Sequence, residues 1–91
     1  MRRVRVVVVG RVQGVGFRWF VRQEARRLGV AGWVRNRPDG AVELETAGED
    51  TAVERLLQHV RVGPDAADVS EVLISDAQPS GSVPYPFSIL K

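Results

Sequence analysis

The pattern of apolar and polar positions along this chain of 91 residues predicts alternating strands and helices. Residues 4–9 are an almost unbroken run of β-branched residues, which is typical of a central β-strand covered on both faces. After a glycine-rich segment, apolar residues recur at steps of three and four, and this spacing predicts a helix that Gly29 ends. The residues of that apolar stripe are Phe17, Phe20, Val21, Ala25 and Leu28.

The next segment predicts a β-hairpin. Two short strand-like runs, residues 33–37 and 42–46, flank residues 38–40, whose proline and glycine suit a tight turn. On the second run, Glu43 and Glu45 alternate with apolar positions, and we expect both to lie on an exposed strand face. Such a placement argues against catalysis by paired carboxylates.

A second helix follows the hairpin. Thr51 and Glu54 have the spacing of a capping box at a helix start, and the glycine and proline at residues 63–64 mark its end. The apolar stripe of this helix, which we expect to face the sheet, consists of Ala52, Val53, Leu56, Leu57 and Val60.

The last third of the chain completes the predicted sheet. Val69, Val72 and Ile74 indicate a fourth strand, residues 78–86 are rich in turn formers, and residues 87–90 add a short fifth strand at an edge. The order βαββαβ plus that edge strand predicts an α+β, ferredoxin-like split βαβ fold. Its two helices pack on one face of a mixed, mainly antiparallel sheet. We expect residues 1–91 to form a single domain.

The residue types in the sequence exclude several kinds of catalytic and metal-binding site. The chain has no cysteine, which excludes disulfides, thiolate nucleophiles and cysteine-ligated metal centres. Its single histidine, His59, lies beside the apolar stripe of the second helix and is expected to be a surface residue rather than a ligand. The basic and then apolar N-terminus is too short to span a bilayer and lacks a cleavage site, so we interpret it as a strand of a cytoplasmic protein without a membrane partner.

Charge is distributed unevenly although the net charge is only +2. Residues 1–37 contain ten arginines and one acidic residue, whereas residues 38–91 contain three basic and ten acidic residues. Such an asymmetry indicates either an anionic partner, a small phosphate or a nucleic acid, or simply a solvated surface. Arginine suits bidentate recognition of phosphate better than lysine does.

The segment that carries candidate chemistry is residues 10–18, between the first strand and the first helix. Its glycines allow successive backbone N–H groups to converge, and the helix N-terminus adds partial positive charge, so the loop can form an anion-binding nest. Arg18, at the helix start, can reach the same anion. The alternative is that the glycines only form a tight turn between the strand and the helix, and that Arg18 is solvated. The glycine spacing fits neither the dinucleotide-binding motif nor the Walker motif, which argues against nucleotide binding.

Two segments, GRVQGVGFR at residues 10–18 and GWVRNRPDGAVE at residues 32–43, resemble the two signature segments of the acylphosphatases. The resemblance implies hydrolysis of acyl phosphates to a carboxylate and inorganic phosphate, with Arg18 binding the phosphate and Asn36 orienting the attacking water. It also implies a reaction that needs no metal or other cofactor. For the oligomeric state, a monomer is our default expectation. The phosphate-binding loop residues that it implies are Arg11, Val12, Gln13, Gly14, Val15, Gly16 and Phe17, next to Arg18.

Two other functions are compatible with the pattern. RNA-recognition domains share the βαββαβ order, but they stack bases on aromatic residues of the third strand, where residues 42–46 offer none and carry two acids. We therefore expect no nucleic-acid partner. An accessory phosphate-handling or carbamoyl-phosphate-handling role is the third possibility, since larger hydrogenase-maturation proteins contain an acylphosphatase-like domain. We expect Trp19 and Trp33 to be packing or pocket-wall residues rather than stacking platforms.

Overall fold

The computed structural model describes residues 1–77 and 81–90. Strands and helices follow one another in the order that the sequence predicts, with boundaries that differ by a few residues. The elements are β1 (Arg2–Arg11), α1 (Phe17–Leu28), β2 (Ala31–Asn36), β3 (Val42–Gly48), α2 (Asp50–Val62), β4 (Asp68–Asp76) and β5 (Ser88–Ile89).

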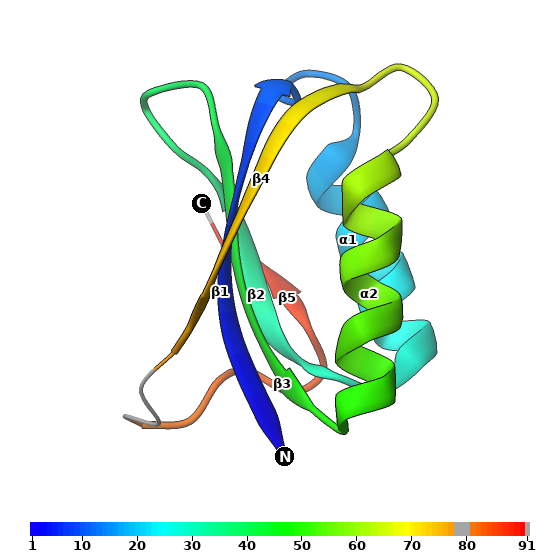
Figure 1. Cartoon of the computed structure of the whole chain (residues 1–91), viewed down its shortest axis with the longest axis vertical. Coiled ribbons are helices and arrows are strands. Elements are labelled where there is room, and N and C mark those ends of the chain that lie inside the picture. The colour runs from blue at the N-terminus through cyan, green and yellow to red at the C-terminus, as the bar shows by residue number, and fades with distance from the viewer. Residues whose placement is uncertain (78–80, 91) are drawn as a thin grey trace.

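The strands form one sheet in the order β4-β1-β3-β2-β5, and both helices lie against the same face of it (Figure 1). β5 runs parallel to β2 at the sheet edge, whereas the other neighbours are antiparallel. The predicted ferredoxin-like α+β fold with a short fifth edge strand is thereby confirmed. Of the turn-rich stretch expected at residues 78–86, residues 78–80 lie outside the described residues.

β1 is central in the sheet, but the expectation that both its faces are covered is wrong. Val4, Val6 and Val8 are fully buried beneath the helices, whereas Arg5 and Val9 point to the opposite, helix-free face, where Val9 is 37% exposed. β-branched residues favour a strand that has neighbouring strands on both sides, whether or not other elements cover both faces of that strand. We call this helix-free side the open face.

The core lies between the sheet and the two helices. α1 ends as expected at Gly29, which adopts a left-handed conformation and donates its backbone N–H to the carbonyls of Ala25 and Arg26. The helices have 12 and 13 residues, and in the described part of the chain no helix is long and apolar enough to cross a membrane. The fully buried side chains of the core include Phe17, Val21, Ala25, Val34, Leu44, Val53, Leu56, Val60 and Phe87.

The predicted capping box of α2 is wrong. The helix begins at Asp50, Glu49 is its N-cap, and no side-chain hydrogen bond caps this end. Thr51 therefore lies inside the first turn, and Glu54 instead forms an ion pair with Arg2 of the neighbouring strand. A carboxylate that finds a cation on another element is not available to close a local cap.

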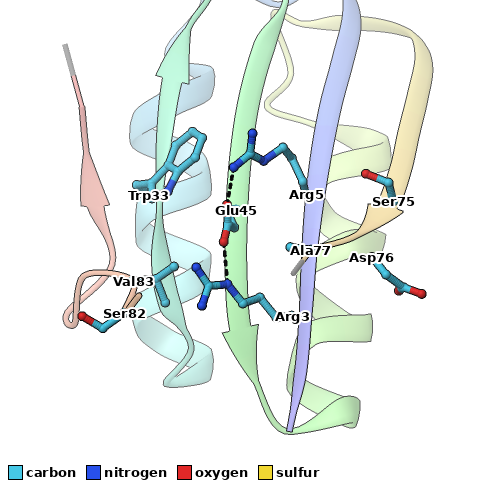
Figure 2. Close-up of a pocket in the computed structure, with 9 residues that line it drawn as sticks. All are labelled: Arg3, Arg5, Trp33, Glu45, Ser75, Asp76, Ala77, Ser82 and Val83. Carbon is cyan, nitrogen blue, oxygen red and sulfur yellow. Dashed lines mark hydrogen bonds and ion pairs between the residues drawn. The ribbon is translucent and has the colours of Figure 1, made fainter. Parts of the chain in front are cut away.

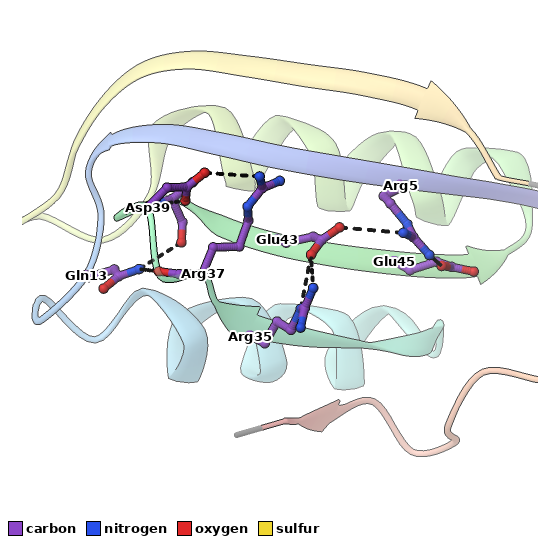
Figure 3. Close-up of polar contacts among 8 residues, drawn as sticks. Arg5, Gln13, Arg35, Arg37, Asp39, Glu43 and Glu45 are labelled. Carbon is purple, nitrogen blue, oxygen red and sulfur yellow. Dashed lines mark hydrogen bonds and ion pairs between the residues drawn. The ribbon is translucent and has the colours of Figure 1, made fainter.

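Glu43 and Glu45 are also placed differently from the prediction. They do lie on the open face, but only 5% and 3% of their surfaces are exposed, because arginines of the flanking strands cover them. Glu45 accepts hydrogen bonds from Nε of Arg3 at 2.5 Å and Nη2 of Arg5 at 2.7 Å. Glu43 accepts from Nε and Nη2 of Arg35 at 3.0 and 2.8 Å (Figure 3). The pairing of strands therefore buries the carboxylates of Glu43 and Glu45, although the alternation of residues along this one strand predicts that they are exposed to water.

This arrangement accounts for much of the charge asymmetry along the chain. Arginines from the first 37 residues pair with acidic residues that follow position 38, so the two halves neutralise each other across the sheet. Trp33 lies among these charges, with the guanidinium carbons of Arg5 and Arg35 at 5.5 and 5.7 Å from its ring centroid. The arginines that form these pairs are Arg2, Arg3, Arg5, Arg35 and Arg37.

The pKa of Glu45 leads to a prediction about stability. Burial alone would raise this pKa, but the hydrogen bonds from Arg5 and Arg3 outweigh burial and hold the pKa below the ordinary value. The ionised carboxylate therefore stabilises the folded state at neutral pH, and this contribution is lost as the pH falls below about 4.5 towards the lowered pKa. We expect Glu45→Gln to lower the free energy of unfolding by about 1–2 kcal/mol at pH 7.

Urea unfolding of the wild type and Glu45→Gln between pH 7 and pH 3 measures this contribution. The difference between the two proteins is expected to shrink across the acidic end of the range. Glu54→Gln is the matched control, because the pair of Glu54 with Arg2 is exposed and worth little. Equal losses in the two variants, or a difference that does not change with pH, would contradict the interpretation.

Candidate active site

The glycine-rich segment connects the end of β1 to the start of α1. The pairing of β1 with β4 shifts register between Val9 and Gly10, where the strand bends into the loop. Gly10 has φ +135, and a Cβ atom built on it would lie 2.2 Å from the backbone oxygen of Asp68. Only glycine lets the two strands approach this closely at the bend. The sequence position of Gly10 thus fixes where the loop leaves the sheet.

Two further glycines shape the loop into a candidate nest. Gly14 and Gly16 adopt left-handed conformations with φ 76 and 80, and Gly16 is the N-cap of α1. The first N–H groups of a helix have no partner within the helix, and here the first turn contains no acidic residue to offset its partial positive charge. The local backbone therefore favours an anion at this end of α1.

Arg18, from the first turn of α1, and Asn36, from the end of β2, line the same pocket beside this loop. The pocket has a volume of about 200 Å³, below the range of about 300–1,000 Å³ typical of drug-sized ligands, and so suits a small one. It is lined by Val12, Gly14, Gly16, Phe17, Arg18, Trp19, Asn36 and Ile89.

Arg18 differs from the arginines of the open face. Its side chain is half-buried at the pocket, and in residues 1–77 and 81–90 no carboxylate lies within ion-pair distance of it. An arginine held partly out of water without an acidic partner is well suited to an anionic ligand.

Asn36 is the last residue of β2. It pairs in register with Val42, which places it on the same side of the sheet as the helices. Its Oδ1 atom is buried and has no hydrogen-bond partner among the protein atoms that the structure describes. A buried acceptor without a partner costs about 1–3 kcal/mol, so groups of this kind generally bind water or a ligand.

A side chain of the loop fastens it to the hairpin that follows Asn36. Nε2 of Gln13 donates to the carbonyls of Arg37 and Ala41, both at 2.8 Å. Figure 3 shows Gln13 reaching from the loop to the turn, where Arg37 and Asp39 form their own ion pair at 3.0 Å. This link holds Asn36 in a fixed position relative to the glycine loop.

The predicted site residues divide into two groups. Five of the loop residues and Asn36 line the pocket, as given above. The side chains of the other three lie elsewhere: Arg11 is exposed at the end of β1, Gln13 bonds to the hairpin, and Val15 packs against the core. The prediction for these three therefore concerns their backbone amides only.

Two residues of the pocket were not among the predicted site residues. Trp19 was expected to be a wall or packing residue, and it lines this pocket. Ile89 reaches the pocket because β5 pairs with β2 and sets Ile89 opposite Val34. A two-residue edge strand carries too little pattern to predict its neighbour, so the sequence held no signal for Ile89.

A larger pocket of about 550 Å³ lies at the open face (Figure 2). Arg3, Arg5, Trp33 and Glu45 contribute to its lining, and Glu45 neutralises both arginines. None of the predicted site residues lines it. We therefore place the candidate chemistry in the smaller pocket.

His59 lies between the two helices rather than at the pocket. Its Nε2 atom is 3.2 Å from Nη2 of Arg27 and 3.3 Å from Oε1 of Glu24, and its ring meets the edge of Phe20. In the part of the chain that the structure describes, no three His, Asp or Glu side chains form a group that could hold a metal ion.

Comparison with known proteins agrees with the two signature segments. A model of the acylphosphatase family matches residues 4–89. An acylphosphatase of Bifidobacterium longum is 53% identical over 74 residues, which cover 81% of this chain and 76% of that protein. An acylphosphatase of Anaeromyxobacter dehalogenans is 52% identical over 81 residues, which cover 89% of this chain and 87% of that protein.

The fold comparison leads to the same family. The crystal structure of acylphosphatase from Bacillus subtilis is similar to this chain with a TM-score of 0.93 and 37% identity, covering 100% of both chains. The chain therefore belongs to the acylphosphatase family of hydrolases.

Proposed function

We propose that this chain hydrolyses the carboxyl-phosphate bond of acyl phosphates to a carboxylate and inorganic phosphate. The observation that carries the proposal is the shared pocket of Arg18 and Asn36 beside the glycine loop. Arg18 and the backbone amides of residues 11–17 bind the phosphate, and Asn36 orients the attacking water.

The chemistry of an acyl phosphate matches this small set of groups. Its leaving group is a carboxylate, which departs without a strong general acid, so catalysis can rest on positioning and charge stabilisation. Phosphoryl transfer spreads negative charge over the equatorial oxygens. N–H donors of the loop and the guanidinium of Arg18 stabilise that charge, a role that magnesium has in many other phosphoryl-transfer enzymes.

The role of Asn36 follows from what a carboxamide can do. It does not titrate near neutral pH, so it holds water by hydrogen bonds rather than removing its proton. The unpartnered, buried Oδ1 atom supports this role, because it is an acceptor that water can use. A phosphate oxygen of the substrate takes the proton from the attacking water.

We further propose that residues 1–91 act as one domain and as a cytoplasmic monomer that needs no metal ion or other cofactor. The open face supports the absence of an RNA partner, because β3 presents Glu43 and Glu45 there and the arginines beside them are already paired. The physiological partner is a small acyl phosphate.

Removal of either pocket group is expected to abolish most activity. Arg18→Ala should lower kcat/KM for benzoyl phosphate about 100- to 1,000-fold, because the phosphate loses a charged donor. Asn36→Ala should lower mainly kcat, because the substrate still binds but water is no longer oriented. Hydrolysis is followed by ultraviolet absorbance with a chelator present.

Arg55→Ala is the control for charge removal, since Arg55 is exposed on α2 and does not line the pocket. Its kcat/KM should stay within about twofold of the wild type. Circular dichroism checks that each variant is folded. A folded wild type that does not hydrolyse benzoyl phosphate would falsify the proposed function and favour an accessory phosphate-binding or an RNA-binding role.

The mechanism also predicts how activity depends on histidine. His59→Gln should retain kcat/KM within about twofold, because His59 contacts Arg27 and Glu24 between the helices and does not line the pocket. The pH profile of kcat/KM between pH 5 and 8 should be the same for both proteins. A pH dependence of kcat/KM that is present in the wild type and disappears in His59→Gln would contradict the role assigned to the substrate oxygen.

A further inference from the structure

Apolar side chains that the proposed reaction does not use also line the pocket. We propose that Trp19 forms the binding wall for the acyl group, so that the enzyme prefers acyl phosphates with flat aromatic acyl groups over small aliphatic ones. This inference rests on the proposed function and adds a substrate class to it.

The position of Trp19 is unusual for its size. It follows Arg18 directly in the first turn of α1, yet 56% of its surface is exposed, whereas Phe17 and Val21 of the same helix are buried in the core. A large exposed aromatic side chain that lines a pocket is a common anchor for an apolar ligand.

Among the described residues, the Trp19 ring has no polar or aromatic partner. Trp33, the other tryptophan, has cation–π contacts with the guanidinium groups of Arg5 and Arg35. No ring–ring or cation–π contact of Trp19 is found within residues 1–77 and 81–90. Because Trp19 is largely exposed and lines the pocket, its indole can contact a ligand there.

The pocket is lined by residues of two chemical kinds. Arg18, Asn36 and the backbone of the glycine loop supply polar groups, to which the phosphate is proposed to bind. Trp19 from α1 and Ile89 from β5 are apolar walls supplied by separate elements. A phosphate held by Arg18 brings the adjoining acyl group within reach of these walls, because Arg18, Trp19 and Ile89 all line the same small pocket.

The physical basis of selectivity is contact area and ring geometry. A benzoyl ring can stack on the indole and lose apolar surface to water, whereas an acetyl group is too small to cover either wall. The phosphate contacts are the same for both substrates, so a change at Trp19 should appear in the ratio of their kcat/KM values.

The test compares benzoyl phosphate and acetyl phosphate hydrolysis by the wild type, Trp19→Ala and Trp19→Phe. Trp19→Ala should lower the ratio of kcat/KM for benzoyl over acetyl phosphate about five- to tenfold, and Trp19→Phe should restore most of it. A ratio cancels any loss of folded enzyme that affects both substrates equally. Tyr85→Ala is the matched control, because Tyr85 is an aromatic residue that is 73% exposed and does not line this pocket.

The outcomes separate this inference from the function on which it rests. An unchanged ratio in Trp19→Ala, with both substrates still hydrolysed, overturns the role of Trp19 and leaves the acyl phosphatase activity in place. An equal fall of the ratio in Tyr85→Ala also overturns it, since the effect would then not belong to the pocket. Failure of the folded wild type to hydrolyse either substrate overturns both proposals.

Discussion

The antiparallel pairing of β3 with both β1 and β2 is the constraint on which the candidate site depends. It sets Val8, Val42 and Asn36 in one row across the sheet. The row lies two residues before Gly10, where β1 bends into the glycine loop. The strand register therefore places Asn36 beside the glycine loop, although the whole of α1 lies between this loop and Asn36 in the chain. A shift of one residue would turn Asn36 to the open face, away from Arg18.

The same register explains how the protein accommodates its many arginines. On the open face Glu45 lies directly opposite Arg5 of β1, and Glu43 lies opposite Arg35 of β2. These two arginines and Arg3 cover the two carboxylates. The charges of this face are largely satisfied within the protein, which leaves little field there to attract an anion. Arg18 lies on the helix side, at a pocket where the described residues offer it no carboxylate. Position relative to the sheet, rather than residue type, separates a structural arginine from one available to a ligand.

The candidate site combines a loop whose shape is set locally with hydrogen bonds that connect the loop to a distant part of the chain. Backbone conformation at Gly14 and Gly16 and the start of α1 shape the loop, and these are local properties of residues 10–18. The hydrogen bonds of Gln13 to the hairpin connect that loop to β2 and β3, so a local motif is held against a distant one. Backbone N–H donors that are held in place in this way are effective in phosphoryl transfer, because they need no rearrangement when charge develops.

The sequence by itself determined the order of elements, the two helical faces, the hairpin and the glycine loop, because each is a local pattern of periodicity or turn residues. It also predicted Arg18 and Asn36 as candidate site residues, through their resemblance to two signature segments. Tertiary structure alone decided the burial of Glu43 and Glu45, the uncovered face of β1 and the start of α2, because each depends on a partner from another element. It also decided that Ile89 joins Trp19 at the pocket, since strand neighbours at a sheet edge are set by packing and pairing that no local pattern encodes.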